Sequence, residues 1–149
     1  MENNNKYTID KLNQIISIAE DGKEGYENAA ENVKNVSIKN SLIYISGERS
    51  AYASQVRQIV QQINGEAEDE GGGAVGTLHR LWIDLKSVLT SGDTDAILNA
   101  CITGEEAAIK EYKSVLEDDE IHESYKPLIR EQLHGIELAL ANIKLHVSQ

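Results

Sequence analysis

The sequence has little of what marks secreted, disulfide-linked or zinc-binding proteins. Cys101 is its single cysteine, so no intramolecular disulfide can form, and no Cys/His spacing typical of a zinc site occurs. No apolar run approaches the ~20 residues that a membrane-spanning helix needs. The polar start, Met1 to Lys6, lacks the pattern of a secretory signal. We therefore expect a soluble cytoplasmic protein.

Basic residues, proline and phenylalanine are also scarce. The 149 residues hold 14 Lys and Arg against 25 Asp and Glu, a net charge of −11. This excess repels phosphate backbones and anionic lipid, which argues against nucleic-acid and membrane partners. With one proline, no phenylalanine and many helix-forming residues, the chain is typical of an all-α domain. Its length suits a single domain, 1–149.

Apolar residues recur every three or four positions in four long segments and one short one, which predicts helices. The expected elements are helices over 8–36 and 37–64, a Gly- and acid-rich loop over 65–75, a crossover helix over 76–90, and helices over 93–117 and 123–147. Thr8 and Ser37 are the expected N-caps of the first two helices. The very short first link favours an antiparallel hairpin. We predict a ferritin-like four-helix bundle, two antiparallel helical hairpins with a short extra helix in the long crossover.

Several polar residues share a face with the apolar ones, at similar heights along the bundle. They form a predicted buried polar layer of Lys23, Glu48, Glu105, Gln132, Tyr26, Tyr52 and Tyr112. An unpaired buried carboxylate costs several kcal/mol. The layer therefore needs hydrogen bonds and a salt bridge with Lys23, a protonated carboxyl group, or a metal ion.

The metal alternative has candidate ligands in Glu27, Glu48 and Glu105. Di-iron bundles take a Glu from each of two helices and a Glu-x-x-His pair from each of the other two. The pair Glu131 and His134 points away from the predicted core face, so the ligand set is incomplete. We expect no cofactor, with a divalent ion held by carboxylates as the alternative.

Three further features have simple structural interpretations. Cys101 is expected to pack as a small apolar residue. His79, Arg80 and Trp82 are expected to anchor the crossover helix to the outside of the bundle. Leu138 and Leu145 fall on the outer face of the last helix, where either the crossover helix or a second subunit in a homodimer would cover them.

Short motifs distributed along the chain resemble those of one protein family. They are Asp21-Gly22, Gly25-Tyr26, Ala29-Ala30-Glu31, Glu48-Arg49, Leu78-His79-Arg80-x-Trp82, Cys101 followed by Gly104-Glu105, and Gln132. This pattern, from about Tyr7 to Ile143, resembles a bacterial family of four-helix-bundle proteins of unknown function grouped with the ferritin-like superfamily. The resemblance implies a ferritin-like fold without an assigned activity. The family's fourth helix often carries a histidine where this chain has Leu140, which further weakens the metal alternative.

The function we expect is that of a non-catalytic structural, binding or stress-associated protein with a buried polar layer. One alternative is a carboxylate-bridged protein that binds a divalent metal such as iron, or an oxidase. The other is a protein that binds a small molecule in the bundle core.

Overall fold

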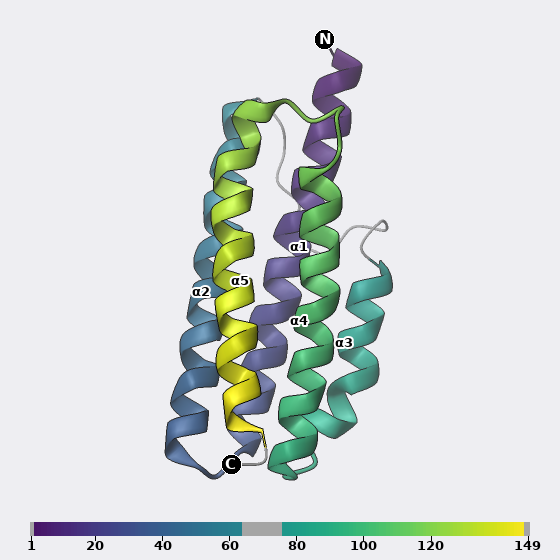
Figure 1. Cartoon of the computed structure of the whole chain (residues 1–149). Helices are drawn as coiled ribbons and strands as arrows, with labels where there is room; N and C mark the ends of the chain where they lie inside the picture. The colour runs from purple at the N-terminus through teal and green to yellow at the C-terminus, as the bar shows by residue number, and fades with distance from the viewer. Residues whose placement is uncertain (1, 64–75, 148–149) are drawn as a thin grey trace.

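The structure is a computed structural model that describes residues 2–63 and 76–147 (Figure 1). These residues form α1 (Glu2–Asn32), α2 (Val36–Gln62), α3 (Gly76–Leu89), α4 (Thr94–Leu116), the 3-10 turn η2 (Glu123–Tyr125) and α5 (Lys126–His146). No helix in these two ranges is long and apolar enough to cross a membrane.

The helices form two hairpins and one outer segment. α1 packs against α2, α4 packs against α5, and α1 also packs against α4. α3 lies beside α4 and α1 on the outside of the bundle, where it returns the chain toward the start of α4 (Figure 1). The predicted all-α bundle of two hairpins with a short crossover helix is confirmed.

Local sequence explains most of the helix ends. The Asn35 side chain caps α2 by accepting a hydrogen bond from the Ile38 backbone N–H (3.0 Å). α4 begins after Gly92, whose φ of +84° suits glycine, and Asp93 caps it in the same way. Pro127 lies in the first turn of α5, as its missing N–H predicts.

Two predicted caps are wrong. α1 begins at Glu2, so Thr8 lies inside the helix and is buried. α2 begins at Val36, because Asn35 and not Ser37 accepts the first free N–H. The loop expected over 65–75 lies outside the described residues.

Trp82 attaches α3 to the bundle. A Cβ on Gly25 of α1 would lie 2.4 Å from its ring, and one on Gly104 of α4 would lie 2.3 Å from it. The indole therefore fills a notch that two glycines open, and Tyr26 meets it edge to face at 5.9 Å. His79 adds a second attachment through Nδ1, which lies 2.9 Å from Asp21 Oδ1 on α1. Arg80 is exposed.

Candidate functional site

The centre of the bundle contains a buried ion pair. Arg49 of α2 donates from both terminal nitrogens to both carboxylate oxygens of Glu105 of α4, at 2.5 and 2.7 Å. Both residues are almost inaccessible, with 2% and 0% exposure. The two helices lie diagonally across the bundle, so this pair spans its core. Two-point geometry of this kind satisfies the carboxylate and fixes its orientation.

Two tyrosine rings and a glycine surround the Arg49 side chain. Its guanidinium carbon lies 5.5 Å from the Tyr26 ring centre and 5.9 Å from that of Tyr52. A Cβ on Gly22 would lie 3.6 Å from Arg49 Nη1, an ordinary contact distance, so this buried glycine of α1 lies directly beside the Arg49 side chain. Burial by itself lowers the pKa of Arg49, but the close negative charge of Glu105 outweighs this, so the pKa is raised overall. Arg49 is therefore positively charged.

Two buried tyrosines complete the surroundings of the pair. The Tyr26 hydroxyl lies near Glu105 without a well-aligned hydrogen bond. Burial and the Glu105 charge raise the pKa of Tyr26 well above its usual range, and burial also raises the pKa of Tyr112. Both phenols therefore stay protonated at neutral pH.

Gln132 links three helices beside the ion pair. Its carbonyl oxygen accepts a hydrogen bond from the Tyr112 hydroxyl (2.8 Å), which joins α5 to α4. Its amide nitrogen donates to the Tyr52 backbone oxygen (3.2 Å) and to the Gln55 side chain (2.9 Å), which joins α5 to α2. Gln132 is thus a fully bonded buried amide with a structural task.

The structure brings only part of the predicted polar layer together. Glu105, Gln132, Tyr26 and Tyr112 are buried, and Tyr52 is half-buried beside them.

Lys23 does not lie in this layer, because Gly22 takes the inward position on α1. Lys23 instead pairs at the surface with Glu27 (3.9 Å). Glu48 is half-buried and faces the space between α2 and α5 rather than the centre.

The three candidate metal ligands do not meet. Glu27 is at the surface, Glu48 lines a lateral groove, and both oxygens of Glu105 accept hydrogen bonds from Arg49. In the two described ranges, no three His, Cys, Asp or Glu side chains gather as a metal site. The pair Glu131 and His134 is exposed, as its predicted direction required. These residues do not fit a di-iron or carboxylate-bridged centre.

Arg49 is the central residue that a search for apolar periodicity misses. The buried residues of α2 repeat at intervals of three and four and include Leu42, Ile45, Arg49, Ala53 and Val56. This register, followed without regard to residue type, places Arg49 inward. Because charged side chains are mostly exposed in proteins, residue type alone predicts that Arg49 lies at the surface.

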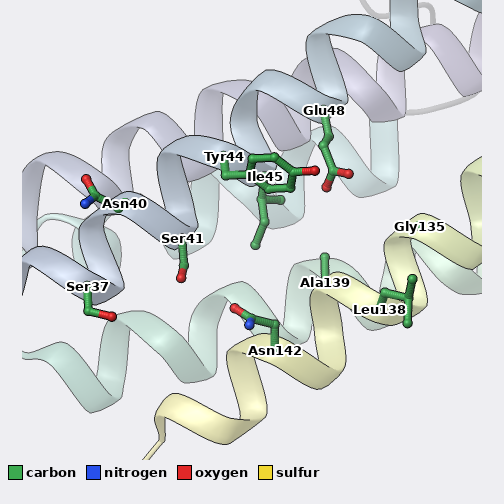
Figure 2. A pocket seen from close by; sticks show the side chains of 10 residues that line it. All are labelled: Ser37, Asn40, Ser41, Tyr44, Ile45, Glu48, Gly135, Leu138, Ala139 and Asn142. Carbon is green, nitrogen blue, oxygen red and sulfur yellow. The ribbon is translucent and has the colours of Figure 1, made fainter.

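A groove of about 550 Å³ separates α2 from α5. The residues that line it are Ser37, Asn40, Ser41, Tyr44, Ile45, Glu48, Gly135, Leu138, Ala139 and Asn142. Figure 2 shows side chains of the two helices directed toward one another across it. At the Gly135 end of the groove, Tyr52 of α2 reaches α5. Its hydroxyl lies so close to Gly135 that a Cβ there would be 2.0 Å from it. We call this feature the α2–α5 groove.

Glu48 is the single charged residue among those that line the groove. Burial raises its pKa, and the Arg49 charge and a hydrogen bond from Tyr44 offset this only in part. Figure 2 shows the Tyr44 hydroxyl beside the Glu48 carboxylate. None of the ion pairs in the described residues includes Glu48.

Cys101 lies in the core one turn before Glu105 and is completely buried. Burial, reinforced by the Glu105 charge, raises the pKa of its thiol to about 12. The thiol therefore stays protonated and packs as an apolar group.

The chain matches a known protein family. No curated protein matches the chain. A family described as a domain of unknown function, DUF2383, matches residues 7–118, which hold both Arg49 and Glu105. Because this match covers most of the 149 residues, the chain belongs to the DUF2383 family.

Proposed function

We propose that this protein is a non-catalytic binding protein whose binding site is the α2–α5 groove. The observation that carries this proposal is the groove itself, a hollow of about 550 Å³ in which apolar side chains alternate with polar ones. The apolar side chains are Ile45, Leu138 and Ala139, and the polar ones are Ser37, Asn40, Ser41, Tyr44, Glu48 and Asn142. A volume of this size is typical of small-molecule sites.

The contacts of the core support a role without catalysis. Arg49 and Glu105 neutralise each other, and the Gln132 side chain forms hydrogen bonds that link α5 to α4 and α2. The two buried phenols stay protonated. A general base needs a free acceptor of suitable pKa within reach of a substrate. Glu105 is instead bound by Arg49, and the Gln132 carbonyl oxygen accepts from Tyr112.

A neutral fluorescent probe, N-phenyl-1-naphthylamine, tests the proposal. We expect saturable binding with a rise in probe fluorescence. Ala139 lines the groove, so Ala139→Phe should fill it and weaken binding about tenfold. Ala141 is exposed on the same helix, and Ala141→Phe serves as the matched control that leaves binding unchanged. No saturable binding, or equal binding by both variants, would overturn the proposal.

We further propose that the chain is a member of the ferritin-like superfamily. The connectivity supports this placement, since the two hairpins are joined by a crossover that includes α3. Superposition of an experimental structure on ferritin-like bundles tests it, and a different helix order around the bundle would contradict it.

A homodimer through the outer face of α5 is a second candidate property. Leu138 and Leu145 are 59% and 68% exposed, so α3 does not cover them. Sedimentation equilibrium of the wild type and of Leu145→Glu tests this candidate. We expect a wild-type dimer and a monomeric variant, and a monomeric wild type would exclude the interface. Leu145 does not line the groove, so this experiment leaves the binding site intact.

A further inference from the structure

We infer that the α2–α5 groove binds a small organic cation, a primary ammonium group with a short apolar tail. This inference rests on the proposed function and specifies the chemical class of its ligand. The evidence lies in one carboxylate outside the ion pairs of the described residues, in the apolar side chains that share its groove, and in the charge of the whole chain.

Glu48 provides the anionic end of the site. Among the residues that the structure describes, it is the only charged side chain that lines the groove, and none of their ion pairs neutralises it. The adjacent guanidinium of Arg49 is turned inward and held by Glu105. Partial burial therefore leaves Glu48 with a desolvation cost that an entering cation would offset.

The groove around Glu48 suits the rest of such a ligand. Ile45, Leu138 and Ala139 provide apolar contact area for a short hydrocarbon tail. Figure 2 shows Ile45 and Ala139 directed into the gap below Glu48. Tyr44 places an aromatic ring and a hydroxyl at the same end as the carboxylate, where an ammonium group can contact both.

The charge of the chain favours the same ligand class. The sequence carries a formal net charge of −11, which attracts cations and repels anions at low ionic strength. A carboxylate ligand would meet both this field and Glu48. A neutral ligand would leave Glu48 without a cationic partner.

Three six-carbon probes that differ only at their head group test the inference: hexylammonium, 1-hexanol and hexanoate. Backbone amide shifts of α2 and α5 in ¹⁵N-labelled protein report binding in the groove. We expect hexylammonium to bind at least about tenfold more tightly than 1-hexanol, because its hydrogen bond to Glu48 adds the attraction of opposite charges, which a hydroxyl donor lacks. Hexanoate should bind more weakly than 1-hexanol.

Glu48→Gln should reduce the affinity for hexylammonium to that for 1-hexanol. Glu27→Gln removes the same charge at the surface and should leave the preference intact. Equal affinity for hexylammonium and 1-hexanol in the wild type, or a preference that survives in Glu48→Gln, would overturn the inference. If the naphthylamine binds but the ammonium preference is missing, only the ligand class is wrong. If neither the naphthylamine nor any of the three probes binds, the proposed function fails as well.

Discussion

The two sides of the bundle are closed in different ways. On one side, Trp82 of α3 fills a notch between glycines of α1 and α4. On the other, α2 and α5 touch at Tyr52 and Gly135 and then diverge along the groove. Six large apolar side chains of the described residues are exposed: Val36, Ile43, Tyr44, Ile83, Leu138 and Leu145. All except Ile83 belong to α2 or α5.

This difference shows that α2 is held without continuous packing against α5. α2 packs along α1, and the Arg49–Glu105 pair connects it diagonally to α4. Gln132 adds a polar connection from α5 at the level of Tyr52. Because these contacts fix α2 from other directions, the groove below them can remain open to a ligand.

The largest expected effect comes from breaking the diagonal ion pair. Glu105→Ala should destabilise the protein by about 3–5 kcal/mol, because it leaves the Arg49 charge buried without a partner. The double variant Arg49→Met/Glu105→Leu removes both charges and should recover most of this loss. Urea unfolding measures both values. A single variant as stable as the wild type would contradict the role of the pair.

The next effect concerns the closed side. Gly104→Ala should cost about 1–3 kcal/mol, because its Cβ would overlap Trp82, which Gly25 confines from the other side. Gly47 of α2 has open space around it, so Gly47→Ala should stabilise the protein by about 0.5–1 kcal/mol. Thermal unfolding of the two variants should therefore show shifts of opposite sign. Equal shifts would mean that Trp82 does not fill a tight notch.

A smaller effect is expected for the second attachment of α3. His79 is half-exposed and Asp21 is mostly covered, so removing their contact should cost less than about 1 kcal/mol. His79→Ala should lower the melting temperature slightly relative to His134→Ala, a matched substitution at an exposed helix position. Identical melting temperatures would show that the contact between His79 and Asp21 does not help to hold α3.

The smallest expected effect is a pH-dependent change in stability caused by Glu48 on the open side. The folded-state pKa of Glu48 is raised, so the folded state binds a proton more readily than the unfolded chain. Its ionisation therefore makes the wild type less stable as pH rises through the window between the ordinary Glu value and that raised pKa. Glu48→Gln lacks this loss and should gain stability relative to the wild type between pH 4 and 7. Urea unfolding at both pH values checks the sign, and a relative loss at pH 7 would contradict it.

Periodicity alone predicted most of the architecture. The spacing of apolar residues located the five helices, and it placed Glu105 and Gln132 among buried neighbours. The apolar face of the last helix likewise predicted that Glu131 and His134 point outward, and both are exposed. These predictions succeed because a helix in a bundle turns its apolar face toward its neighbours.

The rest depends on contacts between helices that a single segment does not encode. Gly22 rather than Lys23 faces inward, where it lies beside Arg49 of another helix. Arg49 is buried because Glu105 lies opposite, a pairing across 56 positions of sequence. The α2–α5 groove depends on how far two helices diverge, which apolar periodicity does not report.

Trp82 has one more consequence, since it is the only tryptophan of the chain and is 7% exposed. Its indole emission reports on the junction of α1, α3 and α4 and on no other part of the molecule. Loss of α3 from the bundle would expose the ring and shift this emission to longer wavelength. The fluorescence of Trp82 therefore reports detachment of α3 from the bundle, independently of ligand binding in the α2–α5 groove on the opposite side.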